Sequence, residues 1–327
     1  MHHNNLRYLF LAALWVITPV AAQAAEKLDY PTRPVRLIVP FAPGGSVDIS
    51  SRVLAGPLSE LLGQQVVVDN RSGASGSIGA AIVAKAAPDG YTLVAGSSGS
   101  MTANRAVYSN LPYDSLRDFV PISMINITPM VIVTYPGLPV TTVKELIELA
   151  RTRPGKIAVA SAGTGTSNHL ALELFQSKVD AKYLHVPFKG TGAAYTDLIG
   201  GQVHVMFDQI ASAIGHVNGG RLRAIAVTTL HRSSVLPNTP TVDESGVKGY
   251  DAASFTGILA PARTPQKVVD RLHAAVVKAA QHPAVLARFK ELAADPKTTT
   301  QQEFSQFMRE DIAKWQKVAQ LANIKLD

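Results

Sequence analysis

A glycine pair between an expected strand and an expected helix is suited to bind an anion. Residues 35–39 form a short apolar β-branched run typical of a buried strand, and apolar residues recur at helical spacing over residues 49–62. Between them, Gly44 and Gly45 carry no side chain that would keep a ligand from the backbone. Unpaired N–H groups and the helix dipole at such a helix start favour a carboxylate or phosphate. The glycines could also serve turn geometry alone, so both interpretations stay open.

Two further loops repeat this arrangement. The expected strand 91–95 leads into Gly96–Ser100, and the expected strand 157–160 leads into Ser161–Thr166, where another helix starts. Strands that alternate with helices predict a parallel sheet, and ligands bind beyond the carboxyl ends of its strands. We therefore expect the loops after residues 39 and 95 to lie at the same sheet edge.

Four ionisable side chains near these loops have more than one interpretation. Asp48 could contact a ligand or only cap its helix. His169 could pair with Asp208 as a base and its orienter, or bond only its own loop. Lys189 could be a counter-ion or a solvated loop charge. Asp208 could also hold an ammonium group or an ordered water, or cap the next helix.

The sequence lacks the motifs of the common enzyme classes. The stretches that begin at Gly73 and Gly96 both lack the closing glycine of a nucleophile elbow. Gly163 and Gly165 are not followed by the third glycine of a dinucleotide fingerprint, because Asn168 occupies that place. The chain has no cysteine, hence no disulfide, thiol nucleophile or thiolate metal site. We predict no catalytic residue, no cofactor and no bound metal.

The first 24 residues have the pattern of a secretory signal peptide. A start containing Arg7 precedes the apolar run 8–17, and Ala22-Gln-Ala24 forms a cleavage site. Cleavage before Ala25 would remove one arginine and no acid, changing the formal net charge from +7 to +6. The remaining Lys and Arg residues are scattered, which argues against a nucleic-acid partner. No later stretch is apolar enough to cross a bilayer, so we expect a soluble periplasmic protein.

Six motifs follow one another along the chain: Phe41–Asp48, Val68–Gly76, Asp89–Leu93, Gly163–Leu170, Pro187–Gly190 and Gly200–Asp208. Taken together and in this order, they resemble the Bug family, the periplasmic solute receptors of tripartite tricarboxylate transporters. The resemblance extends from about Tyr30 to the C-terminus, and the combination is specific although each motif alone is weak. It implies an α/β fold of the two-domain periplasmic-binding-protein type (type II-like), with two crossing strands and a carboxylate in an interdomain cleft.

The chain of 327 residues suggests two domains. We expect the extended runs 122–133 and 250–259 to be the crossings between them. Residues 1–24 are then the signal peptide, residues 25–127 and 251–327 form domain 1, and residues 128–250 form domain 2. Helices that start near Thr264-Pro265 and at the Thr300/Glu303 capping box are expected to pack on domain 1.

The resemblance also places ligand-binding residues on two walls of the cleft. One wall would carry Phe41, Pro43, Gly44, Gly45 and Asp48, with Ser97, Ser98 and Ser100 beside them. The opposite wall would carry Thr164, Gly165, Thr166, His169, Lys189, Gly190 and Asp208. We expect backbone amides of loops 43–46 and 163–166 to hold the carboxylate, because neither loop contains an arginine. One departure from the family pattern is Ser254-Phe255, where a tryptophan is common.

The sequence therefore predicts a monomeric periplasmic receptor that captures a small carboxylate for the membrane subunits of a tripartite tricarboxylate transporter. Two alternatives would use the same cleft: a ligand sensor for a membrane signalling kinase, and a secreted hydrolase or lyase on the same fold. A cytoplasmic regulator is disfavoured, because the N-terminus has a signal peptide pattern where such a regulator has a helix-turn-helix.

Overall fold

One mixed β-sheet runs through the whole molecule. The structure is a computed structural model that describes residues 29–325. Eight of its ten strands follow the order β2-β1-β3-β9-β4-β7-β5-β6. The other two, β8 and β10, pair with β4 outside this order. The strands are β1 Val35–Val39, β2 Val66–Asn70, β3 Thr92–Ser97, β4 Phe119–Thr134, β5 Ala158–Ser161, β6 Leu184–Pro187, β7 Val205–Gln209, β8 Arg223–Val227, β9 Ala253–Pro261 and β10 Asp295–Pro296.

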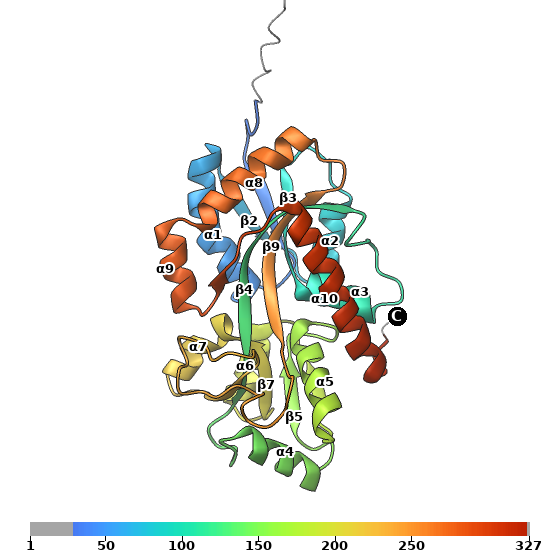
Figure 1. Cartoon of the computed structure of the whole chain (residues 1–327), viewed down its shortest axis with the longest axis vertical. Coiled ribbons are helices and arrows are strands. Elements are labelled where there is room, and N and C mark those ends of the chain that lie inside the picture. Colours follow the sequence, from blue (N-terminus) through green and yellow to red (C-terminus); the bar gives the residue numbers. More distant parts are fainter. Residues whose placement is uncertain (1–28, 326–327) are drawn as a thin grey trace, which may run out of the picture.

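Helices cover both faces of this sheet (Figure 1). The α-helices are α1 Ser46–Leu62, α2 Ser77–Ala84, α3 Asn104–Val107, α4 Val143–Thr152, α5 Ser167–Val179, α6 Thr191–Ile199, α7 Ile210–Asn218, α8 Gln266–Ala280, α9 Pro283–Glu291 and α10 Gln301–Leu321. A 3₁₀ turn spans Ala74–Gly76 and a π-helical turn spans Ser98–Ala103. Within residues 29–325, no helix is both long and apolar enough to cross a membrane.

The elements form two lobes, an upper and a lower one in Figure 1. In the upper lobe β1 pairs in parallel with β2 and β3, and β9 pairs antiparallel with β3 and β4. Helices α1, α8 and α9 bury their apolar residues on one face of this part of the sheet. In the lower lobe β5 pairs in parallel with β6 and β7. There α4 and α5 cover one face, while α6 and α7 cover the other.

Strand β4 belongs to both lobes. Its residues Phe119–Pro129 pair with β9, and its residues Met130–Thr134 pair with β7 and β8. Met130 and Ile132 point into the core beside α5, whereas Val131 and Val133 point into the core beside α6 and α7. Because both faces of this part of β4 are buried, its residues 130–133 are all apolar and do not alternate with polar ones. The predicted α/β fold with a crossing strand is confirmed, while the domain boundaries stay a prediction.

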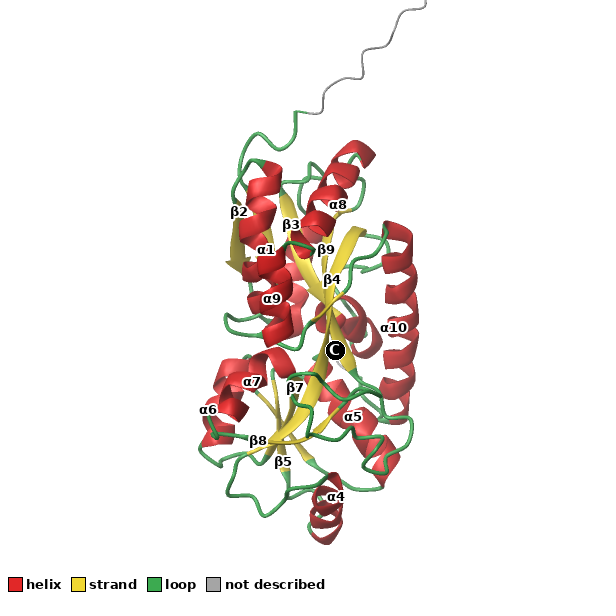
Figure 2. Cartoon of the chain, turned by 60° about the vertical axis from the view of Figure 1, so that its left-hand side comes forward, coloured by secondary structure: helices red, strands yellow, loops and turns green. Residues whose placement is uncertain are grey.

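Helix α10 packs on both lobes, contrary to the expectation that the C-terminal helices pack on domain 1 alone. Phe304 and Met308 lie in the upper-lobe core, whereas Trp315 and Val318 lie in the core around α5. The helix has 21 residues and is therefore about 30 Å long, which is enough to reach past the junction (Figure 2). Its predicted capping box is confirmed: the Thr300 hydroxyl accepts from the Glu303 N–H at 3.2 Å.

Candidate functional site

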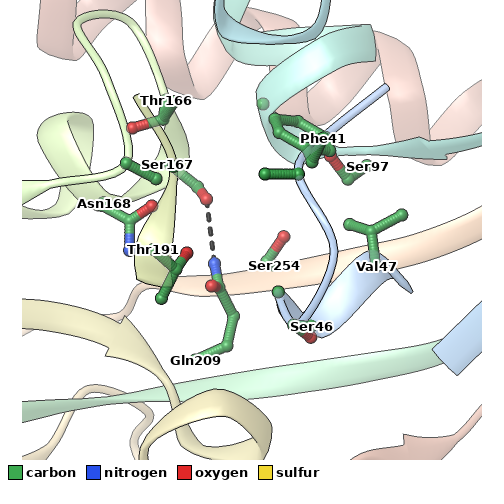
Figure 3. Close-up of a pocket in the computed structure, with 15 residues that line it drawn as sticks. Phe41, Ser46, Val47, Ser97, Thr166, Ser167, Asn168, Thr191, Gln209 and Ser254 are labelled. Atoms are coloured by element: carbon green, nitrogen blue, oxygen red, sulfur yellow. Dashed lines mark hydrogen bonds between the residues drawn. The ribbon is translucent and has the colours of Figure 1, made fainter. Parts of the chain in front are cut away.

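A small cavity lies where helix starts of the two lobes face each other (Figure 3). Its volume is about 40 Å³, whereas a single water needs roughly 10–15 Å³. It therefore suits a small polar group, such as the head of a larger ligand. The lining residues are Phe41, Ala42, Gly45, Ser46, Val47, Ser97, Gly99, Ala162, Thr166, Ser167, Asn168, Gly190, Thr191, Gln209 and Ser254. We call this space the inner cavity.

The starts of four helices meet at the inner cavity. The N-cap residues of α1, α5, α6 and α7 are Gly45, Thr166, Gly190 and Gln209, and all four line the cavity. None of these four described caps has a side-chain hydrogen bond to its helix. By contrast, α4 and α10 start with a threonine that caps the helix. The helices at the cavity therefore leave their first N–H groups available to an anion.

Charged side chains are absent from this lining. Among the described residues around the inner cavity, none is Lys, Arg, Asp or Glu. Lys189 instead lines a neighbouring space of about 490 Å³, which we call the outer cavity. The two spaces share Phe41, Ala42, Ala162 and Gly190. An anion in the inner cavity would therefore be stabilised by helix dipoles and N–H groups, with Lys189 on the outer side.

The two lobes touch beside the cavities. A Cβ atom added to Gly190 would lie only 3.1 Å from the Cβ of Ala42 in the other lobe. The Ser75 hydroxyl of the upper lobe donates a hydrogen bond to the Thr164 carbonyl of the lower lobe. Since Ser75 and Thr164 both line the outer cavity, this bond lies at its border. The arrangement is that of a closed cleft.

Asp48 supports the glycine loop and does not line the inner cavity. Its carboxylate accepts from the Gly44 N–H at 3.0 Å and from Asn70 Nδ2 at 2.9 Å, and it pairs with Arg52 at 3.0 Å. Burial opposes its ionisation, but the hydrogen bonds from Arg52, Gly44 and Asn70 outweigh burial and lower the pKa of Asp48. The prediction that Asp48 caps α1 is wrong, because Gly45 holds the N-cap position.

His169 bonds its own loop. Its Nδ1 accepts from the Gly165 N–H at 3.1 Å, and its Nε2 lies 3.4 Å from a Glu173 oxygen. Its ring stacks on His185, with ring centres 3.9 Å apart. Burial, followed by the charge of His169, lowers the pKa of His185 to about 3. Among the described residues His169 makes no hydrogen bond to Asp208, so the base-and-orienter pair does not form.

Asp208 lies behind the cavity wall. It is fully buried, and its two oxygens accept from the Tyr195 hydroxyl at 2.6 Å and from Asn168 Nδ2 at 2.7 Å. Burial raises the pKa of Asp208 to about 6, although these hydrogen bonds act in the opposite direction. Asp208 therefore reaches a ligand only through Asn168. Within residues 29–325 no group of His, Cys, Asp and Glu is suited to hold a metal ion.

The structure brings some of the predicted site residues to the two cavities and leaves others outside. Phe41, Gly45, Ser97, Thr166 and Gly190 line the inner cavity, and Thr164 and Lys189 line the outer one. Pro43, Gly44, Asp48, Ser98, Ser100, Gly165, His169 and Asp208 line neither. Ser100, for example, does not face a cavity, because its hydroxyl accepts a hydrogen bond from the Ser97 N–H within its own turn. Which of these residues contact a ligand stays a prediction.

Several lining residues were not predicted as ligand contacts: Val47, Ser167, Asn168, Thr191, Gln209 and Ser254, while Ser46 was expected to contribute only its backbone amide. Most of them are the first residues of a helix that follows a small-residue loop. A rule that follows each such loop two residues into its helix would have found Ser46, Ser167 and Thr191. Ser254 lies in the second crossing, at the position where the sequence departs from the family pattern. That departure could have indicated Ser254 as a candidate site residue.

Comparison with known proteins identifies the family. Residues 50–324 match the sequence model of the tripartite tricarboxylate transporter family receptor. The chain belongs to this receptor family. It is 37% identical to the protein BugT of Bordetella pertussis over 324 residues, which cover 99% of both chains. The resemblance to Bug proteins is thus confirmed, and receptors of this family are periplasmic.

Solved structures agree in fold. The R. palustris protein Rpa4515, solved with adipate, is 38% identical with a TM-score of 0.88, over 91% of this chain and 99% of that chain. MatC of Rhodopseudomonas palustris, solved with bound malate, is 32% identical with a TM-score of 0.85, over 88% of this chain and 99% of that chain. The fold of this receptor is therefore that of periplasmic solute-binding proteins.

Proposed function

We propose that this receptor binds a small carboxylate between its lobes and presents it to the membrane subunits of a tripartite tricarboxylate transporter. One observation carries the proposal: four helix starts without side-chain caps meet at a cavity whose described lining has no charged side chain. Two relatives of the same fold were solved with carboxylates, adipate and malate.

The carboxylate is held mainly by backbone N–H groups at the starts of α1 and α5. Gly45 and Ser46 supply such N–H groups on one side and Ser167 supplies one on the other, whereas the Thr166 N–H already donates to the Gly163 carbonyl at 3.3 Å. Hydrogen bonds to an ionised group are shorter and stronger than neutral ones. Lys189 lies in the outer cavity and is exposed, so it contributes a smaller, screened attraction.

The lobes act as two domains that close on the ligand. Domain 2 would comprise residues 128–250, and β4 and the chain into β9 would form the hinge. Residues 1–24 act as a signal peptide cut before Ala25, a segment that lies outside the described residues. The mature protein works in the periplasm as a monomer and carries out no reaction on its ligand.

Thermal unfolding with a panel of carboxylates tests this function on protein that was unfolded, stripped of ligand and refolded. A ligand that binds only the folded state raises Tm, and the stabilisation grows with the logarithm of the ratio of ligand concentration to Kd. We expect at least one small carboxylate to raise Tm, and its neutral amide to leave Tm unchanged. An amide that stabilises as well as its acid would contradict the proposal. Recovery of the acid unchanged after long incubation tests the absence of turnover.

A further inference from the structure

Asn168 presents a fixed hydrogen-bond acceptor to the inner cavity. Its Nδ2 donates to the Phe207 carbonyl and to the Asp208 carboxylate, each at 2.7 Å. Both partners are acceptors, so turning the amide over would place its oxygen against two other oxygens. The orientation of this amide is therefore determined by its partners. In Figure 3 its oxygen points toward the wall that carries Phe41, and its nitrogen points away.

The carboxylate of Asp208 polarises the Asn168 amide and makes its oxygen a stronger hydrogen-bond acceptor. The carboxylate is fully buried and has no salt-bridge partner among the described residues. Its pKa of about 6 leaves it ionised at neutral pH, and the Tyr195 hydroxyl donates to its second oxygen at 2.6 Å. An uncompensated negative charge directly behind Asn168 makes this side of the cavity attractive to a donor and repulsive to a second oxygen anion.

Three other polar side chains of the lining, Gln209, Thr191 and Ser254, can adapt to a ligand. Gln209 Nε2 lies 3.0 Å from the Ser167 hydroxyl, which can donate or accept, so the Gln209 amide can be turned over. The hydroxyls of Thr191 and Ser254 rotate in the same way. The hydroxyls of Thr166 and Ser97 are engaged within their own loops, since Thr166 donates to the Gly163 carbonyl at 2.7 Å and Ser97 accepts from the turn that follows it. Asn168 differs from them because its protein partners fix its nitrogen and leave its oxygen to the cavity.

We propose that the ligand of this receptor carries a hydrogen-bond donor next to its carboxylate, a hydroxyl or ammonium group on the α-carbon, which donates to Asn168 Oδ1. The inference rests on the proposed function, because the carboxylate must occupy the same cavity. A volume of about 40 Å³, a few times what one water needs, suits a carboxylate and the group beside it. A plain acid would leave the Asn168 carbonyl unpaired in a closed site, and such sites reject analogues that lack the matching donor.

Calorimetry on the refolded protein with matched acids tests this inference. The pairs are succinate with L-malate and L-aspartate, and glutarate with L-2-hydroxyglutarate and L-glutamate. We expect the donor-bearing acid to bind about tenfold more tightly, or better, in each set that binds. The hydroxy and amino arms show which donor is preferred. Equal or tighter binding of the plain acids overturns this inference alone, whereas the absence of binding by every acid of the wider carboxylate panel contradicts the proposed function as well.

A variant assigns the preference to Asn168. The substitution Asn168→Leu keeps the size of the side chain and removes the acceptor, so the two acids of a pair should bind with nearly equal affinity. The control Gly215→Ala lies outside this lining, within α7, where an added Cβ meets no atom within 4 Å, and should keep the preference. Full preference in a folded Asn168→Leu protein overturns the assignment. If that variant fails to fold, the comparison of acids on the unchanged protein decides.

Discussion

The substitution Gly45→Val should remove ligand binding while the protein stays folded. Gly45 has φ −79° and ψ 164°, an extended conformation that any residue adopts. A Cβ atom added there would lie 3.7 Å from the Ala42 carbonyl oxygen and 3.8 Å from Thr191 Oγ1, which are ordinary contacts. The backbone therefore accepts a side chain, and the cost comes mainly from replacing glycine at an N-cap, about 0.5–1 kcal/mol.

The effect on binding is much larger. Since the Cβ already touches the opposite wall, the two methyl groups of valine must enter a cavity of about 40 Å³ or separate the lobes. Either outcome displaces the carboxylate from the N–H groups of α1. A hydrogen bond to a charged group is worth about 1.5–3 kcal/mol, so two lost bonds raise Kd by more than about 100-fold.

Calorimetry with the acid that binds best measures this change, and thermal unfolding checks the fold. We expect Gly45→Val to lower Tm by only a few degrees. The matched control Gly215→Ala changes an exposed glycine within α7, where an added Cβ meets no atom within 4 Å. It should raise the free energy of unfolding by about 0.5–1 kcal/mol and leave Kd unchanged. A folded Gly45→Val protein with the parent's Kd would refute the reasoning.

Four further predictions concern charge, pH, closure and processing. Lys189→Ala should raise Kd less than about fivefold by calorimetry, because Lys189 is exposed and lies in the outer cavity; complete loss of binding would contradict this. Asp208 binds its proton more tightly in the folded state, so its contribution to stability is present below pH 3.8 and is lost as pH rises to about 6. Denaturant unfolding should therefore show Asp208→Asn gaining about 2 kcal/mol over the parent between pH 4 and pH 7, and a constant difference would argue against it. Small-angle scattering should give a smaller radius of gyration with a tightly bound acid, unless the free protein is already closed; an open form that keeps its radius counts against closure. N-terminal sequencing of exported protein should start at or near Ala25, and an intact Met1 would exclude the signal peptide.

Local patterns predicted the elements that depend on neighbours in the chain. The run 35–39 and the spacing over residues 49–62 anticipated β1 and α1, and the two Thr-x-x-Glu boxes anticipated α4 and α10. Helix α7 was anticipated only through the interpretation of Asp208 as its cap, which is wrong because Gln209 is the N-cap, and helix α9 was not anticipated. Each follows within two residues of the preceding element, so no loop signal separates it from that element.

Tertiary partners determined what the sequence could not show. Asp48 is held by Asn70, which lies 22 residues away, so its supporting role was indistinguishable from capping or ligand contact. Asn168 became important only because β7 brings Phe207 and Asp208 beside it, 39 and 40 residues along the chain. The packing of Trp315 against the lower lobe depends likewise on where α10 ends in space.

A crystal structure with the best-binding acid tests most directly whether helix starts hold the carboxylate. We predict that both carboxylate oxygens lie in the inner cavity, within about 2.7–3.1 Å of backbone N–H groups at the starts of α1 and α5. A carboxylate paired with the ammonium group of Lys189 in the outer cavity, with the inner cavity holding no part of the ligand, would contradict it.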